Sequence, residues 1–277
     1  MGDKPVEYCS DYKYLGTSIN EFLGFDFSAS VMADSAGRAL GALITNKIKN
    51  GGFPLNAYKK LYESSVCSVS DYGGEIWGFK EYDDTKQIHL RAIRAFIGIP
   101  KRAPTPGVLA EMNWLEPRSR TQIRMIRHFK RLTKLPDHRL TKKVFLWDRT
   151  LNDSSNIKTW AHEIKEILCR NNKEYLYDSP YFCIQSTVKE LQESLIEKDQ
   201  TKWEVDCRKK PKLRTFVVFK EFKTETSYLF KPLSFVQRKF MAKLRLGVLS
   251  LHIETGRFLR PRLPAEERLC RGAQTPP

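Results

Sequence analysis

The chain has 277 residues, and its 48 Lys and Arg residues outnumber its 32 Asp and Glu residues, so its formal net charge at pH 7 is +16. Hydrophobic residues make up 41% of the chain and aromatic residues 12%, which excludes a wholly disordered chain. No apolar stretch approaches the roughly 18 residues that a membrane-spanning helix needs. The first residues do not show the charged and then apolar pattern of a secretory signal. The length predicts one or two domains.

The six cysteines do not suggest a disulfide-bonded scaffold. No two of them stand at CxxC spacing, and a chain of this length does not need disulfides to hold a fold. We therefore expect reduced thiols and a nuclear or cytoplasmic location.

The charge is unevenly distributed along the chain. Residues 1–85 carry a net −4, residues 86–149 a net +12, residues 150–204 a net −3 and residues 205–277 a net +11. Separate basic blocks favour a polyanionic partner, because each Lys or Arg contact with a phosphate releases condensed counterions. The alternative is an ordinary solvated surface.

The first half of the chain shows a short β pattern followed by helical spacing. Tyr, Val, Leu and Ile interspersed with polar residues over Val6–Ile19 are typical of one or two short strands that end at Asn20. Apolar spacing and glycine or proline boundaries then predict helices over Phe27–Lys49, from Pro54 to Gly73-Gly74 with Tyr58, Leu61, Tyr62 and Val66 inward, and from an Asp83 or Asp84 cap to Ile97.

The second half is predicted to be helical, apart from one strand and one linker. The expected helices are Val108–Met112, Pro117–Lys134, Leu140–Trp147, Ile157–Arg170, Thr187–Asp206 and Leu233–Leu246. Asn152–Asn156 is the best candidate for a linker, and Phe216–Phe222 is a possible strand. The predicted class is therefore mainly α: a helical bundle with a short N-terminal β element, followed by a second helical region. We expect a division into residues 1–25, a basic helical domain at 26–149, a C-terminal helical region at 150–260 and a frayed tail at 261–277.

One predicted helix carries a regular row of cations. Arg120, Arg124, Arg127, Arg131 and Lys134 follow one another at spacings of four and three residues, so they fall within roughly 80° of the helix circumference. The apolar residues Ile123, Met125, Ile126, Phe129 and Leu132 lie opposite. Such a row can follow a phosphate backbone. The alternatives are a solvated face or pairing with acidic residues from 1–85.

Further cations form two weaker groups. Lys209, Lys210 and Lys212 fit a short nuclear-localisation pattern or a loop that contacts phosphates. The helix at Leu233–Leu246 is predicted to place a basic face, formed by Arg238, Lys239, Lys243 and Arg245, against an apolar face formed by Phe235, Val236, Phe240, Met241 and Leu244.

Two fragments of catalytic motifs fail on inspection. His162-Glu163 begins like a zinc-protease helix, but Glu166 stands where the second His is required. Tyr82-Asp83-Asp84 resembles a polymerase metal site, but it lacks the extra residue after Tyr and the apolar flanks of such a hairpin. It is better interpreted as the beginning of a helix.

Six short segments, spread over almost the whole chain, form a recognisable set. They are Tyr12–Gly16, Ser35–Leu43, Tyr58–Ser64, Asp71–Gly78 with the pattern YGxExW, Arg91–Pro100 and Leu263–Cys270. Together they resemble the thumb and C-terminal portion of the reverse transcriptases, or RNA-directed DNA polymerases, of LINE-type (non-LTR) retrotransposons. The first segment of this chain resembles the primer-grip strand of that family. The next ones resemble its thumb helices, and the last resembles the approach to its Cys/His zinc knuckle.

The resemblance also has limits. The fingers, palm and catalytic aspartates that precede the primer-grip strand in these transposable elements have no counterpart here. Ala273 stands where CxxC spacing would place a second Cys after Cys270, so the zinc knuckle is incomplete. The resemblance therefore implies a fragment from a partial or decayed element that is not an enzyme as it stands and holds no metal or other cofactor, since Mg²⁺ belongs to the intact polymerase. Residues 1–25 would be the end of the palm.

What this chain would retain is the grip on nucleic acid. The resemblance implies RNA or an RNA–DNA hybrid as the partner, with no membrane or small-molecule substrate, and the missing palm as a further partner in an intact enzyme. Tyr14, Leu15 and Gly16 would be primer-grip-like. The candidate phosphate-binding residues are Arg91, Arg94, Lys101, Arg102, Arg120, Arg124, Arg127, Arg131, Lys134, Lys209, Lys210 and Lys212.

Two other hypotheses stay open. The same remnant could serve a host as a non-enzymatic nucleic-acid-binding or adaptor protein, which a specific partner would indicate. It could also be a polymerase that another chain completes, which primer extension with Mg²⁺ would test.

Overall fold

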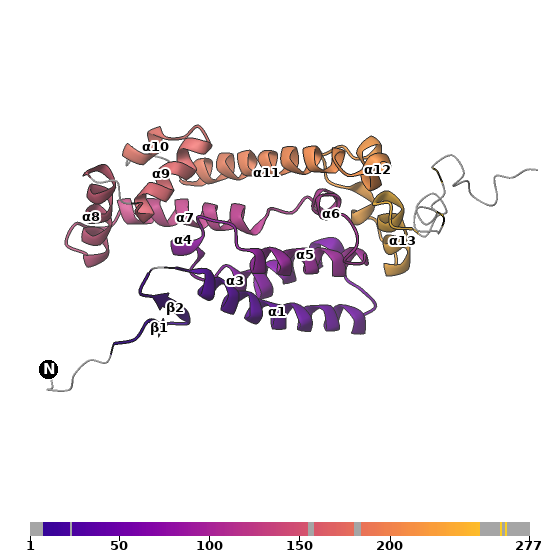
Figure 1. The fold of residues 1–277 in the computed structure, drawn as a ribbon, viewed down its shortest axis with the longest axis horizontal. Helices are drawn as coiled ribbons and strands as arrows, with labels where there is room; N and C mark the ends of the chain where they lie inside the picture. Colours follow the sequence, from indigo (N-terminus) through magenta and orange to yellow (C-terminus); the bar gives the residue numbers. More distant parts are fainter. Residues whose placement is uncertain are drawn as a thin grey trace, which may run out of the picture. The chain divides into compact units, whose positions relative to one another are not determined.

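The computed structural model describes residues 8–22, 24–154, 158–179 and 184–249, together with residues 261 and 264. Helices dominate this part of the chain, and a two-stranded antiparallel sheet precedes them, which confirms the predicted mainly α class with a short N-terminal β element (Figure 1). Almost all of the predicted zinc-knuckle approach at Leu263–Cys270 lies outside the described residues.

The β element is a hairpin. Strands β1 (Asp11–Tyr14) and β2 (Thr17–Asn20) pair in a register that places Tyr14 opposite Thr17. The two turn residues, Leu15 and Gly16, have φ values of 47° and 87°. Positive φ at both positions matches the twist of the paired strands, and Gly takes this conformation without a steric cost. The hydroxyl of Ser28 accepts a hydrogen bond from the Ser18 amide at 3.0 Å, which ties the hairpin to the first helix.

The first helices follow the predicted spacing with one local difference. Helix α1 spans Asp26–Lys49, α2 Leu55–Leu61 and α3 Ser68–Ser70, with a π-helical turn, η1, at Tyr62–Cys67 between the last two. Tyr58, Tyr62 and Val66 are buried as predicted, but Leu61 is 40% exposed, so its predicted inward position is wrong. The buried face here repeats every four residues and leaves Leu61 beside it.

The next four helices form the middle of the chain: α4 (Gly74–Trp77), α5 (Asp83–Ile97), α6 (Thr105–Met112) and α7 (Pro117–Thr133). Helix α3 ends at Ser70, and Gly73, with φ +68°, is the N-cap of α4, so the helix is broken close to the predicted Gly73-Gly74. Helices α4 and α7 pack so closely that a Cβ on Gly78 would lie 2.3 Å from Thr121 Cβ. Asp83 is the first residue of α5 and thus lies in its first turn rather than at the cap.

The remaining helices are α8 (Leu140–Ser154), α9 (Trp160–Arg170), α10 (Tyr175–Asp178), α11 (Ile184–Arg208), α12 (Arg214–Phe219) and α13 (Phe235–Arg245), with 3-10 turns η2 (Pro211–Leu213) and η3 (Ser227–Phe230). Helix α8 is longer than predicted, and Asn152–Ser154 of the predicted linker belong to its last turn. The side chain of Thr159 caps α9, and Ser234 and Gln237 form a capping box at α13.

The predicted strand at Phe216–Phe222 is wrong, because residues 214–219 are helical. Val and Phe favour strands, but that preference reflects packing on a half-buried surface and yields to tertiary contacts. Here burial recurs at Leu213, Phe216 and Lys220, which is a spacing of three and four residues. A helix satisfies that spacing and a strand does not.

The contacts divide the chain into two compact units, each assembled from three stretches. Unit 1 comprises residues 1–45, 59–89 and 115–199, and unit 2 comprises residues 46–58, 90–114 and 200–277. These units are interleaved along the chain. One hydrophobic core of unit 1 contains Phe129, whose ring is stacked on Tyr177 and edge-on to Phe145. In unit 2, Tyr58 packs on Phe96 and Trp114.

The close approach at Gly78 yields a stability prediction. The substitution G78A places a methyl group against both Thr121 and the backbone oxygen of Gly74, and it should lower the free energy of unfolding by about 1–3 kcal/mol or more, measured by urea denaturation. In the matched control G41A, the new methyl group meets nothing within 4 Å inside α1. G41A should raise stability by about 0.5–1 kcal/mol, because alanine favours a helix interior. A neutral G78A would contradict the packing described between α4 and α7.

Candidate nucleic-acid interface

Helix α7 carries the predicted row of cations. Pro117 occupies its first turn, where the missing amide proton is not needed. The five apolar residues predicted to lie opposite the cations, from Ile123 to Leu132, are all buried, which confirms that face. The row itself is not uniform, because a buried carboxylate binds two of its members.

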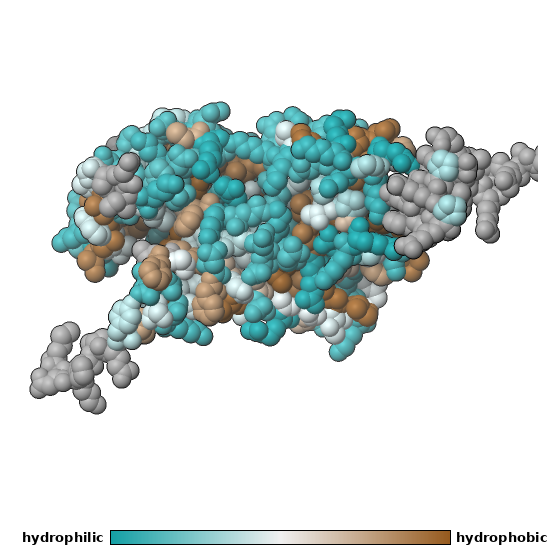
Figure 2. Space-filling model, in the orientation of Figure 1, coloured by the Kyte–Doolittle hydropathy of each residue, from teal (hydrophilic) through white to brown (hydrophobic). Residues whose placement is uncertain are grey.

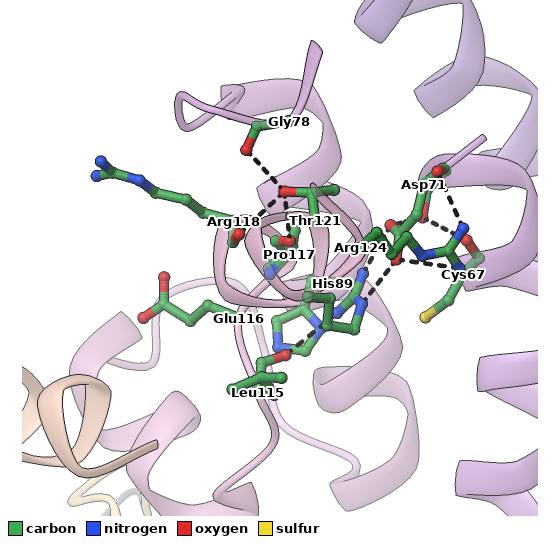
Figure 3. A network of polar contacts seen from close by, with 12 residues as sticks. Cys67, Asp71, Gly78, His89, Leu115, Glu116, Pro117, Arg118, Thr121 and Arg124 are labelled. Carbon is green, nitrogen blue, oxygen red and sulfur yellow. Dashed lines mark hydrogen bonds and ion pairs between the residues drawn. The ribbon is translucent and has the colours of Figure 1, made fainter. Parts of the chain in front are cut away.

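That carboxylate belongs to Asp71, whose side chain is 2% exposed. Arg120 donates to it through Nε at 2.9 Å and through Nη2 at 3.0 Å, in a bidentate pair. Arg124 donates to the backbone oxygen of Asp71 at 3.2 Å, and Figure 3 shows these two residues side by side. Burial alone disfavours the charged guanidinium, but attraction to Asp71 outweighs it and keeps the pKa of Arg120 well above its ordinary value.

The predicted row must therefore be corrected. The Arg120 side chain is only 16% exposed and serves as the partner of Asp71, and Arg124 is 38% exposed. This is the alternative of pairing with an acidic residue from 1–85. Arg127, Arg131 and Lys134 remain exposed on α7. The sequence pattern could not reveal the pairing, because Asp71 lies 49 residues before Arg120.

Grouping the charges by unit shows where the positive charge lies. Unit 1 contains 24 basic and 24 acidic residues, so it is neutral, and unit 2 contains 24 basic and 8 acidic residues, so it carries the entire net charge of +16. The row on α7 belongs to the neutral unit. The strongest attraction for a polyanion is therefore expected at unit 2.

Most of the other predicted binding residues lie in unit 2 and face solvent. Arg91, Lys101, Arg102, Lys209 and Lys210 are exposed, and Lys212 is partly exposed. Lys209 also forms an ion pair with Asp206 at 3.5 Å. Arg94 is half-buried, donates to the Thr105 hydroxyl at 3.2 Å, and has a pKa lowered by burial. It is thus the least available of the group.

Helix α13 directs two of its cations toward the core and exposes most of its apolar face. Arg245 is bidentate to the fully buried carboxylate of Glu111, at 2.8 and 3.2 Å, and Arg238 is 4% exposed with its guanidinium 4.4 Å from the centre of the Phe96 ring. Val236 and Phe240, predicted to be inward, are 73% and 54% exposed. The basic face predicted on α13 is therefore reduced to Lys239 and Lys243, which are partly exposed, because Arg238 and Arg245 have partners in the core.

Lys47 is a further buried cation, outside the basic groups predicted from the sequence. Its ammonium group donates to the backbone oxygens of Ala95 and of Phe96, the latter at 3.2 Å, and lies 4.4 Å from the centre of the Phe235 ring. Burial and, secondarily, repulsion from Arg238 lower the pKa of Lys47 to about 8. Lys47 falls at the end of a predicted helix, and no local signal distinguishes it from an exposed lysine.

The primer-grip-like residues lie in the hairpin of unit 1. Tyr14 and Leu15 are 57% and 73% exposed, and Gly16 is exposed. The hydroxyl of Tyr72 donates to the Leu15 carbonyl at 2.9 Å. Two of the segments that carry the resemblance, Tyr12–Gly16 and Asp71–Gly78, are therefore in contact.

The described residues contain neither a metal-ligand cluster nor a membrane-spanning helix. Within the described ranges, no three His, Cys, Asp or Glu side chains are grouped as metal ligands would be. None of the helices described there is long and apolar enough to span a bilayer. Comparison of the chain with protein families, curated proteins and solved structures finds no match.

The Asp71 cluster predicts a large cost for a small change. D71N leaves two guanidinium groups without their carboxylate and should lower the free energy of unfolding by about 3–5 kcal/mol in urea denaturation. The matched control is D26N, because Asp26 is 73% exposed in its ion pair with Lys80, so it should cost less than about 1 kcal/mol. Adding R120M to D71N should recover part of the loss, and equal effects of D71N and D26N would contradict the cluster.

Lys47 predicts a specific dependence of stability on pH. Its folded pKa of about 8 lies below the ordinary value of 10.5, so the unfolded chain binds more protons above pH 8 and stability rises with pH. Between pH 8 and 9.5 Lys47 alone should contribute a gain of about 2 kcal/mol, which K47M should lose. The buried thiols of Cys67 and Cys207 have raised pKa values and act in the opposite direction over the same range, so the prediction concerns the difference between wild type and K47M. The control K49M changes an exposed lysine of the same helix and should keep the wild-type slope. Denaturant unfolding at several pH values measures all three proteins, and an equal slope for wild type and K47M would refute the burial of Lys47.

Proposed function

We propose that the chain binds nucleic acid through the positive surface of unit 2, without reading its sequence. The observation that carries this proposal is the charge division: unit 2 holds the whole net charge of +16, while unit 1 is neutral. A ligand whose phosphates repeat along its length is the biological polyanion that gains most from such a surface, through release of counterions.

The buried ion pairs support the choice of binding residues. Arg120 and Arg245 neutralise buried carboxylates, so their removal would act on stability rather than on binding. Arg91, Lys101 and Arg102 project from unit 2 and are exposed, and Lys209, Lys210 and Lys212 add cations to the same unit. Arg127, Arg131 and Lys134 on α7 are a second, weaker candidate surface.

The resemblance to LINE-type reverse transcriptases supports a finer version of the proposal. In that version the chain corresponds to the thumb and C-terminal portion, binds RNA or an RNA–DNA hybrid, and does not polymerise by itself. A host protein derived from the same remnant is the alternative. Both share the charge-based grip, so one binding experiment addresses their common basis.

Charge reversal in the two units tests the proposal directly. The triple variant R91E/K101E/R102E should bind an RNA–DNA hybrid more than tenfold more weakly than wild type. The slope of the logarithm of the association constant against the logarithm of the salt concentration should also become less steep by about 2–3, since each phosphate contact contributes about −0.9 for a duplex. Fluorescence anisotropy at 50 to 200 mM salt measures both quantities.

The matched control is R127E/R131E/K134E, which reverses three exposed cations in the neutral unit. It should weaken binding less and leave most of the salt slope. A larger loss in the control than in the unit 2 variant would move the interface to α7. Binding that is absent in wild type at 50 mM salt would refute the proposed function altogether.

A further inference from the structure

Helix α13 exposes an apolar stripe that the described residues of its own unit leave uncovered. At about 100° per residue, Val236, Phe240 and Leu244 fall within roughly 80° of the helix circumference. Their exposed fractions are 73%, 54% and 46%. We call these three residues the α13 stripe.

The α13 stripe faces outward because cations occupy the inner side of the helix. Arg245 pairs with Glu111, and Arg238 lies on the Phe96 ring and donates to the Leu233 carbonyl at 3.3 Å. Burying two guanidinium groups while a phenylalanine is left in water is the opposite of what burial energies favour. Departures of this kind are expected where a surface has a task besides stability.

Cations border the α13 stripe. On the helix circumference Lys243 stands about 20° and Lys239 about 60° from Val236, and both are partly exposed. Lys231, just before the helix, is exposed. Within the described residues these three lysines form no ion pair with a carboxylate.

Other exposed aromatic rings lie in the same part of unit 2. Phe219 at the end of α12 and Phe230 at the end of η3 are 63% and 47% exposed, and α12 contacts α13. Among the described residues of unit 2, the exposed aromatic side chains all fall between Phe219 and Phe240. Figure 2 shows hydrophobic residues among hydrophilic ones where α12 lies, at the right of the view.

We propose that this surface binds single-stranded nucleic acid, with a base stacked on Phe240 and phosphates held by Lys231, Lys239 and Lys243. The inference rests on the proposed function and names its substrate class. In a duplex the base faces are already stacked on one another, so an exposed phenylalanine has little to contact. A single strand offers both base faces and phosphates, and the combination of rings and cations matches it.

The test measures how much the Phe240 ring contributes to the binding of two different nucleic acids. In fluorescence anisotropy with the full chain, F240A should weaken binding of a 20-nucleotide single-stranded RNA by about tenfold, a typical loss for one stacked base. Binding of an RNA–DNA hybrid and the salt slope should stay unchanged. F240W should restore single-strand binding, and F240L should not, because leucine keeps the apolar contact without a stacking face.

The control variant is F27A, which removes a phenylalanine of unit 1 that is 59% exposed. It should leave both affinities unchanged. Thermal melting should show F240A folded, since the ring is half in water. The proposal would be overturned if F240A lowered the affinity for both ligands equally or for neither. It would also be overturned if F240L bound single-stranded RNA as tightly as wild type.

Three further outcomes separate this proposal from its rivals. If wild type binds neither ligand, the proposed function fails together with the inference. If both ligands bind and lose affinity in R91E/K101E/R102E but F240A changes nothing, only the inference fails. Sedimentation that shows a dimer which F240A dissociates, with single-strand affinity unchanged, would assign the α13 stripe to a second copy and overturn the proposal.

Discussion

Two buried carboxylates decide which cations of this basic chain remain available to a ligand. Asp71 in unit 1 and Glu111 in unit 2 are each matched by a bidentate arginine, Arg120 and Arg245. A buried carboxylate without a partner would be far more costly than the pair, so these arginines are held in place by the fold. The remaining exposed cations are then the ones to consider for binding. The excess of positive charge lies in unit 2, which carries a net +16, whereas unit 1 is neutral.

The same constraint explains the unusual face of α13. Once Glu111 requires Arg245 on the inner side of the helix, the residues on the opposite side must face water, and Val236 and Phe240 are among them. Gly107 shows how closely the inner parts of unit 2 approach, since an added Cβ would lie 2.7 Å from Leu246 Cδ2. The apolar surface on α13 is therefore a fixed property of the packed unit. Together with the lysines beside it, it has the composition of a surface for an unpaired strand rather than for a duplex.

Local patterns predicted the elements well and their partners poorly. Helix α7 was predicted from Pro117 and its apolar spacing, and α13 from its spacing and from Leu233 onward, within two residues at most of the observed bounds. These signals come from neighbours in sequence. The role of Arg120 depends on Asp71, 49 residues away, and that of Arg245 on Glu111, 134 residues away. The strand predicted at Phe216–Phe222 is wrong for the same reason. The spacing of its buried residues depends on distant partners: Leu213 lies close to Gly107, and the Phe216 ring lies 5.7 Å from the Arg245 guanidinium. Lys47 could not be distinguished by sequence, since its burial depends on Phe96 and Phe235.

The long separation between Glu111 and Arg245 has a consequence for synthesis on the ribosome. Glu111 emerges early, but its cation follows 134 residues later, which corresponds to a delay on the order of ten seconds at typical rates of translation. During that interval the carboxylate has to stay hydrated, so the surroundings of α6 cannot close. Of the two units, unit 2 is thus the later to mature, and a nascent chain that stalls before α13 would present an unfinished hydrophobic surface to chaperones and proteases.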